Sequence, residues 1–201
     1  MTGIINYGAG NIFSVMNTIE RLDEKTLIIS EPEQLSKVHR IILPGVGAFD
    51  EAMQYLKNHE FVDKLKEEMK KGKPILGICL GLQTFFEKSE EGKLDGLKLL
   101  RGCVKKFPER KGYVIPHMGW NSVKILVESD FVGGVPNKSF FYFAHSYYPV
   151  PEEANFICGT TEYGLEFASI VQKENLIGVQ FHPEKSASCG LIFLENFIKM
   201  R

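Results

Sequence analysis

The sequence predicts an α/β fold with a central, mostly parallel sheet flanked by helices and an additional section of antiparallel strands. In the first half, short apolar runs rich in β-branched residues alternate with helical patterns, as in parallel sheets covered by helices on both faces. From residue 97 onward, short strands instead follow one another, separated by glycine, proline and asparagine, which is typical of antiparallel neighbours.

Each element of the first half follows from its periodicity. Continuous apolar runs predict strands at residues 4–6, 26–29, 40–43 and 74–78. Apolar residues at helical spacing predict helices at residues 11–22, 50–58, 61–71 and 80–88. The turn GAG at residues 8–10 follows the first strand, but a dinucleotide-binding fingerprint would need a third glycine where Phe13 stands. A plain tight turn is therefore the better interpretation.

The second half is expected to be mainly strands. They are predicted at residues 97–107, 121–126, 140–144, 156–161, 168–173 and 177–181. A last helix at residues 191–200 directs Ile192, Phe193, Phe197 and Ile198 toward the core. No internal repeat, low-complexity linker or break in composition separates the halves, so we expect a single domain over residues 1–201.

The charge balance and hydropathy exclude several classes of partner. The net charge of −1 gives no electrostatic reason to expect a nucleic acid or an anionic membrane. No apolar run approaches the ~20 residues that a membrane-spanning helix needs. The first residues lack the basic start and long apolar stretch of a signal peptide, so we expect a cytoplasmic protein.

The cysteine pattern indicates free thiols rather than disulfides or a metal centre. The chain has four scattered cysteines without a CxxC pair, Cys79, Cys103, Cys158 and Cys189. No histidine falls in the spacing of a zinc motif, so no metal and no cofactor are expected.

Cys79 stands where a buried strand is predicted to turn sharply into a helix. Gly77 and Gly81 flank it in a G-x-C-x-G pattern, the thiol counterpart of a nucleophile elbow, in which larger residues would collide. Free N–H groups at the start of the following helix would stabilise a thiolate, and the Leu80 N–H would face a developing oxyanion. A buried structural cysteine beside two packing glycines is the alternative.

His182 is the histidine best placed to act as a base for this thiol. It follows a predicted strand, and the carboxyl ends of parallel strands, where Cys79 would also lie, are where α/β sheets bind ligands. Glu184, two residues on, could accept the imidazole N–H and orient the ring. Alone, His182-Pro183-Glu184 could equally be a surface turn paired with Lys185. The chain order nucleophile, histidine, acid differs from that of α/β-hydrolases.

Two motifs carry a family resemblance. GICLGLQ at residues 77–83, followed by HPE at residues 182–184, resembles the triad (class I) glutamine amidotransferases, whose fold is flavodoxin-like. Further stretches are similar to the glutaminase subunits of imidazole glycerol phosphate synthases: NYGAGN (6–11), PGVGAF (44–49), PHMGWN (116–121), FAHSYY (143–148) and QFHPEKS (180–186). The resemblance runs the length of the chain.

The resemblance implies a role for each matching residue. Cys79 would attack the side-chain amide of glutamine, with His182 as general base and acid and Glu184 orienting it. The Leu80 N–H and a backbone N–H from Val46 or Gly47 would form the oxyanion hole. Residues implied to bind substrate are Gly45, Gln83, His145, Ser146 and Tyr147. Without the resemblance, residues 145–148 would be better interpreted as an aromatic core strand.

The resemblance also implies a partner, a (β/α)8-barrel cyclase subunit that receives the ammonia and forms a heterodimer with this chain in histidine biosynthesis. Residues implied to lie toward that interface are Asn11, His117, Met118, Trp120 and Asn121. Two alternatives stay open at this point. One is a paralogue that serves amidation of a surface-polysaccharide sugar, and the other is a non-enzymatic protein of the same fold type.

Overall fold

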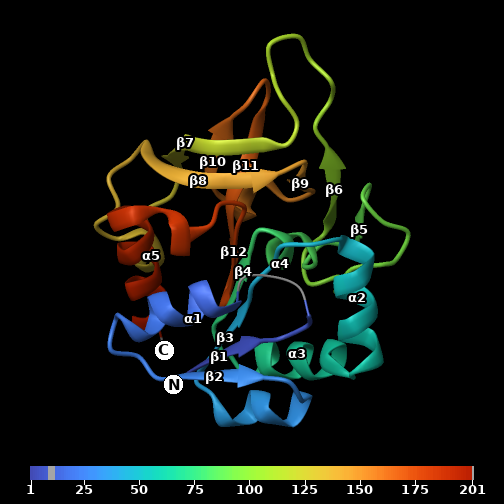
Figure 1. Cartoon of the computed structure of the whole chain (residues 1–201), viewed down its shortest axis with the longest axis vertical. Coiled ribbons are helices and arrows are strands. Elements are labelled where there is room, and N and C mark those ends of the chain that lie inside the picture. The colour runs from blue at the N-terminus through green and yellow to red at the C-terminus, as the bar shows by residue number, and fades with distance from the viewer. Residues whose placement is uncertain (9–11, 201) are drawn as a thin grey trace.

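A nine-stranded sheet runs through the whole of the computed structural model, which describes residues 1–8 and 12–200 (Figure 1). Its strands, in spatial order, are β2 (Thr26–Ile29), β1 (Thr2–Ile5), β3 (Arg40–Leu43), β4 (Ile75–Ile78), β12 (Leu176–Val179), β11 (Glu166–Lys173), β10 (Ile157–Glu162), β7 (His117–Ile125) and β8 (Ser139–His145). Strands β2 to β12 in this order pair in parallel, and those from β12 to β8 pair antiparallel. The predicted α/β class with an antiparallel section is confirmed.

Strand β12 joins the two sections, because it is parallel to β4 and antiparallel to β11. Its register with β4 sets Gly178 opposite Gly77 and Val179 opposite Ile78. The ladder continues one step further, where the Cys79 N–H donates to the Val179 carbonyl at 2.8 Å. The residues that follow both strands therefore emerge side by side at the carboxyl end of the sheet.

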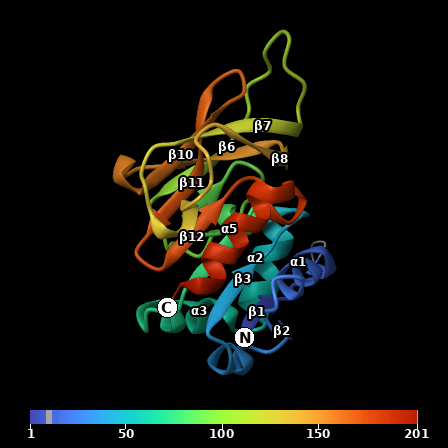
Figure 2. The same cartoon turned by 90° about the vertical axis from the view of Figure 1, so that its left-hand side faces the viewer.

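Helices cover both faces of the parallel section, and strand alternation supplies an apolar core to each (Figures 1 and 2). Helices α2 (Phe49–Asn58) and α3 (Phe61–Lys70) pack on the face that carries Ile5, Ile41 and Ile75. Helices α1 (Ile12–Glu20) and α5 (Ala187–Lys199) pack on the opposite face, which carries a neighbouring residue of each strand, Ile4, Ile42 and Leu76. The continuous apolar runs of the first half are explained by this two-sided burial.

Short elements complete the fold. A second, three-stranded sheet consists of β5 (Lys88–Ser89), β6 (Gly102–Lys106) and β9 (Tyr147–Pro151). The remaining elements are α4 (Leu80–Gln83) and the 3-10 helices η1 (Pro32–Lys37), η2 (Asp130–Val132), η3 (Ala154–Phe156) and η4 (Pro183–Lys185). Within the described residues, the helices are too short or too polar to cross a membrane.

The helix predicted at residues 80–88 is much shorter in the structure, and β5 and β9 were not predicted. Helix α4 ends at Gln83 because the next carbonyl groups accept hydrogen bonds from outside the helix. The Thr84 carbonyl accepts from Leu97 N–H at 2.8 Å, and the Phe85 carbonyl accepts from Leu99 N–H at 2.8 Å. Hydrogen bonds to distant residues thus replace the helical ladder that local periodicity favoured.

Elsewhere the boundaries of the elements differ from the predicted ones by a few residues. Strand β6 is shorter than predicted, and β7 and α5 begin four residues earlier.

A substitution of Phe85 tests how much the core beneath the Cys79 turn contributes to stability. Its ring is fully buried, and its edge fills the space beside Gly77. We expect Phe85→Ala to lower the free energy of unfolding by about 3–5 kcal/mol, because truncating a buried ring removes apolar burial and leaves a cavity. Urea unfolding followed by circular dichroism measures this. Phe140→Ala is the matched control, since that ring is 58% exposed and should change the value by less than about 1 kcal/mol. Equal losses would contradict the assignment of Phe85 to the core.

Candidate active site

Cys79 occupies a sharp turn between β4 and α4, with a backbone φ of 53° and ψ of −107°. A positive φ is unusual for a residue with a side chain and marks a strained position held by its surroundings. The flanking glycines are required by close contacts. A Cβ on Gly81 would lie 1.8 Å from the Leu43 carbonyl oxygen, and one on Gly77 would lie 2.6 Å from the Phe85 ring. The physical reason predicted for the G-x-C-x-G spacing thus holds.

The expected oxyanion donor is engaged in this structure. The Leu80 N–H donates to the Gly45 carbonyl at 3.4 Å, which is a long and weak hydrogen bond. Gly47 has a φ of 128°, which favours glycine, and Val46 beside it is 39% exposed. Helix α4 has only four residues, so its dipole stabilises a thiolate less than the predicted longer helix would. The oxyanion-hole assignment of Leu80, Val46 and Gly47 stays a prediction.

Tyr7 anchors the loop that contains Gly45. Its hydroxyl donates to the Pro44 carbonyl, and its ring is buried at the end of β1. Burial raises the pKa of the Tyr7 hydroxyl far above its usual value, and the nearby Cys79 thiolate raises it further. The phenol therefore keeps its proton and remains a donor.

His182 and Glu184 form a buried pair beside the thiol. The His182 N–H donates to the Tyr142 carbonyl at 2.8 Å, which ties this segment to β8, and Ser186 Oγ donates to the His182 carbonyl at 2.6 Å. The ring places Nδ1 at 2.9 Å from Glu184 Oε1. Among the described residues Nε2 has no hydrogen-bond partner that meets normal geometry, so it is available to the thiol.

Electrostatics favour a protonated ring. Burial alone would lower the pKa of the His182 imidazole, but the Cys79 thiolate and the Glu184 carboxylate together raise it to about 10. A buried thiolate and imidazolium stabilise each other in this way, and the thiolate is the nucleophilic form of cysteine.

Two glutamine side chains connect the thiol to β9. Gln83 Nε2 donates to the Tyr147 carbonyl at 3.0 Å and to Gln180 Oε1 at 3.1 Å. Gln180 Nε2 donates to Cys79 Sγ at 3.5 Å. Gln83 was predicted to contact substrate, but in this structure its amide nitrogen is occupied by these two acceptors. Gln180 was not singled out from the sequence, although a buried glutamine at the end of an apolar strand is a usable signal.

His117 and His145 form a second buried network. His117 Nδ1 lies 2.9 Å from His145 Nε2, His145 Nδ1 lies 2.7 Å from the Tyr147 carbonyl oxygen, and Asn121 Nδ2 lies 3.2 Å from His117 Nε2. Burial lowers the pKa of His117 to about 4 and that of His145 to about 3, so both rings are neutral at pH 7. Because a carbonyl only accepts, His145 Nδ1 donates, which makes its Nε2 the acceptor and His117 Nδ1 the donor.

The predicted interface residues separate into buried and exposed groups. His117 is only 3% exposed, so its side chain supports β7 from within rather than forming a surface contact. Met118 and Trp120 are 64% and 53% exposed. Asn121 donates to the Glu162 carbonyl at 2.9 Å as well as to His117. Asn11 lies outside the described residues.

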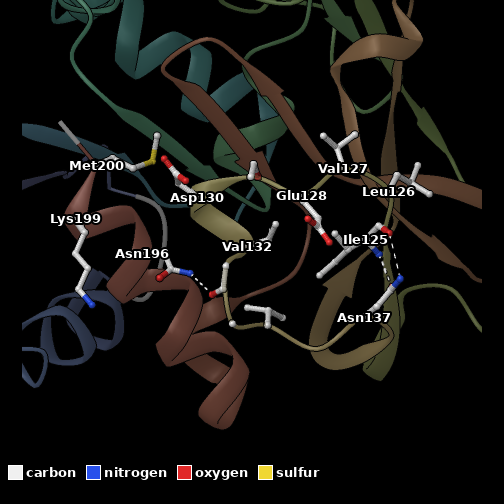
Figure 3. Close-up of a pocket in the computed structure, with 14 residues that line it drawn as sticks. Ile125, Leu126, Val127, Glu128, Asp130, Val132, Asn137, Asn196, Lys199 and Met200 are labelled. Carbon is white, nitrogen blue, oxygen red and sulfur yellow. Dashed lines mark hydrogen bonds between the residues drawn. The ribbon is translucent and has the colours of Figure 1, made fainter.

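The substrate-binding residues predicted between β8 and β9 take part in sheet pairing. His145 is opposite His117 in the β7–β8 ladder, and Tyr147 is opposite Lys106 in the β6–β9 ladder. The Ser146 carbonyl accepts from the Phe107 N–H at 3.0 Å. These residues lie close to Cys79, since Sγ is 3.8 Å from the Ala144 carbonyl oxygen. A separate hollow lies away from Cys79, between the end of β7, η2 and the C-terminal end of α5 (Figure 3).

Comparison with known proteins identifies the family. The model of the family described as "Glutamine amidotransferase class-I" matches residues 4–200 of this chain. The chain belongs to the class-I glutamine amidotransferases. Similar relatives of this amidotransferase include imidazole glycerol phosphate synthase subunit HisH of Moorella thermoacetica, which is 48% identical over 96% of this chain and 92% of the relative. The corresponding subunit of Caldanaerobacter subterraneus is 44% identical over 100% of this chain and 98% of its own.

Solved structures share the amidotransferase fold at low sequence identity. PurLQS from Thermotoga maritima superposes with a TM-score of 0.78 at 16% identity, over 98% of this chain and 96% of that one. The glutaminase domain of Trypanosoma brucei CTPS with bound acivicin gives a TM-score of 0.64 at 18% identity, over 100% of this chain and 94% of that one. At this identity the likeness establishes the fold alone.

The charge state of His182 gives a direct test of the site. We expect its imidazole to stay protonated at pH 8 and to lose its proton near pH 10, because the thiolate and Glu184 raise its pKa. Folding stability from this proton is then fully present below the unfolded value of about 6.5 and is lost as the pH rises through 10. Imidazole ¹⁵N chemical shifts report the titration. In Cys79→Ala the midpoint should fall, and an unchanged midpoint would exclude a thiolate partner.

Proposed function

We propose that this chain is the glutaminase subunit of an imidazole glycerol phosphate synthase. It would hydrolyse glutamine to glutamate and ammonia and deliver the ammonia to a cyclase subunit in histidine biosynthesis. The observation that carries the proposal is the thiol of Cys79 on a strained turn beside a His182–Glu184 pair with a raised imidazole pKa. Relatives that carry this subunit name match the chain over nearly its whole length, which supports the pathway.

The reaction follows from the charge states of the site. The Cys79 thiolate attacks the carbon of the glutamine side-chain amide, and the carbonyl becomes an oxyanion. The His182 imidazolium gives its proton to the departing nitrogen, which leaves as ammonia, and a thioester remains on Cys79. The neutral ring then takes a proton from water, which attacks the thioester and releases glutamate, and the proton restores the pair. Glu184 keeps Nδ1 protonated and Nε2 directed at the reacting atoms throughout.

The oxyanion would be held by the Leu80 N–H and a backbone N–H of Val46 or Gly47. The Leu80 donor is released cheaply, because its bond to Gly45 is 3.4 Å long. Exposed Val46 and the positive φ of Gly47 leave this loop able to reorient. The backbone of residues 145–147 and Gly45 would hold the amino-acid end of glutamine.

The cyclase would dock on the outer face of the β7–β8 hairpin. Met118 and Trp120 are opposite Ala144 and Tyr142, so they project to the same side of the sheet, and both are exposed. Exposed aromatic and methionine side chains of this kind are enriched in protein interfaces. Ammonia transfer across this face would require a one-to-one complex of the two subunits. Residues 1–201 would act as one glutaminase domain. The complex would work in the cytoplasm, without a nucleic acid, a membrane or a cofactor.

Replacing the nucleophile separates the two half-reactions. Cys79→Ala should abolish glutamate release from glutamine, because the thioester intermediate forms on the Cys79 sulfur. The complex of this variant with a purified cyclase subunit should still make product from added ammonium at the wild-type rate. Retained glutamine hydrolysis would overturn the assignment of Cys79. Wild-type hydrolysis that ignores the cyclase and its nucleotide substrate would keep the chemistry but contradict the pathway.

The docking face is tested by a charge placed at its centre. Trp120→Asp should weaken cyclase binding by roughly thirtyfold or more, since truncating a central aromatic residue commonly costs at least about 2 kcal/mol. Calorimetric titration with the cyclase measures the affinity. Leu126→Asp is the matched control, because Leu126 is 47% exposed but follows the far end of β7. Equal affinity of the Trp120 variant and the control would place the interface elsewhere.

A further inference from the structure

Some of the groups around Cys79 Sγ would stabilise a thiolate, and one would destabilise it. The Ala144 carbonyl oxygen is 3.8 Å from Sγ and would repel a negative sulfur. His182 supplies a positive charge, but it gives its proton away during the reaction, so its attraction changes within each cycle. Gln180 Nε2, at 3.5 Å, is a neutral donor that remains in place throughout.

The direction of the Gln180 amide is determined by its neighbours. Gln83 has two N–H groups on Nε2, and both have acceptors, namely the Tyr147 carbonyl and Gln180 Oε1. If the Gln83 amide were reversed, its oxygen would face these two oxygens. With Gln83 fixed, Gln180 Oε1 must be the acceptor, which turns Gln180 Nε2 toward the sulfur.

The Tyr147 carbonyl is itself held by a second donor. His145 Nδ1 approaches it at 2.7 Å, while Gln83 Nε2 approaches it at 3.0 Å. Both lone pairs of this oxygen are therefore in use. The neutral His145 ring is oriented in turn by His117 and Asn121. The acceptor that fixes Gln83 is thus part of the sheet and not a mobile group.

We propose that Gln180 is a thiolate-binding residue of the glutaminase reaction and that Gln83 is a positioning residue that orients it. The inference rests on the proposed function, because it assigns these glutamines to the reacting sulfur of Cys79. Gln180 is fully buried directly after the end of β12 and two residues before His182, so donor and base are carried by one short stretch of backbone. Its N–H would stabilise the sulfur before attack and after each release from the thioester.

Alkylation of Cys79 by iodoacetamide separates this role from substrate binding, because the reagent has no amino-acid end to be recognised. The rate at Cys79, followed by peptide mass spectrometry from pH 4 to 9, reports the formation of the thiolate. The titratable groups facing this site are His182, Glu184 behind it, Tyr7 at the end of β1 and His145 on β8. These groups are retained in every variant, so a shift in a leucine variant reports the lost amide donor.

We expect Gln180→Leu to raise the midpoint of the rate profile by about one pH unit, since a hydrogen bond to a charged group is lost. Gln180→Glu, of the same shape, should raise it further by placing a carboxylate at the sulfur, and it carries the test if the leucine variant does not fold. Gln83→Leu should shift the midpoint in the same direction, and the double leucine variant should shift it no further than Gln180→Leu alone. Gln54→Leu, on the exposed side of α2, is the control.

An unchanged midpoint in both Gln180 variants would overturn the assignment of Gln180. A shift in Gln180→Leu with none in Gln83→Leu would overturn the orienting role of Gln83. Protection of wild-type Cys79 by glutamine is measured in the same samples. Its absence would reject the proposed glutaminase function itself, whereas protection with unchanged midpoints would reject only the role of the two glutamines.

Discussion

The parallel pairing of β4 with β12 is the constraint on which the site depends. It sets Ile78 opposite Val179, and the hydrogen bond from the Cys79 N–H to the Val179 carbonyl extends the ladder to the turn itself. Residues separated by about a hundred positions in the chain thereby become neighbours at one edge of the sheet. The glycines opposite each other in this pairing, Gly77 and Gly178, leave room for the side chains of Phe85 and Leu82. The strained backbone of Cys79 persists because packing on both sides of this ladder leaves it no alternative.

The fold class and most elements could be predicted from the sequence because they depend on local periodicity. Strands β1 to β4 and helices α2 and α3 are close to their predicted ranges. Each strand is a short apolar run that is buried on one face or both, and each helix has one apolar face that is buried against the sheet. Helix α4 and strands β5 and β9 depend on pairing with distant segments, which no local pattern reports. The carbonyl groups of Thr84 and Phe85 accept hydrogen bonds from residues 97 to 100, and these bonds form only when the folded chain brings the two segments together.

The candidate site shows the same division. Cys79, His182 and Glu184 stand in short motifs whose spacing already implies a turn, a base and an orienting acid. Gln180 belongs to the same stretch as His182, yet its relation to the sulfur becomes visible only when Gln83 and Tyr147 are brought beside it. His117, grouped with surface residues by resemblance, proves to be buried because alternate residues of β7 point to opposite sides of the sheet.

The two neutral histidines have a consequence for how local disturbances spread. Asn121 donates to His117, His117 to His145, and His145 to the Tyr147 carbonyl, so every hydrogen bond in this row has the same polarity. Neither ring can adopt its other tautomer alone, because two donors or two acceptors would then meet across 2.9 Å. Because the Tyr147 carbonyl can only accept, the row has a single allowed direction, and its three hydrogen bonds depend on one another. A change at the surface end, where Asn121 is bonded to the last residue of β10, therefore cannot be relayed by reversing the row and reaches Tyr147 only by breaking one of its hydrogen bonds.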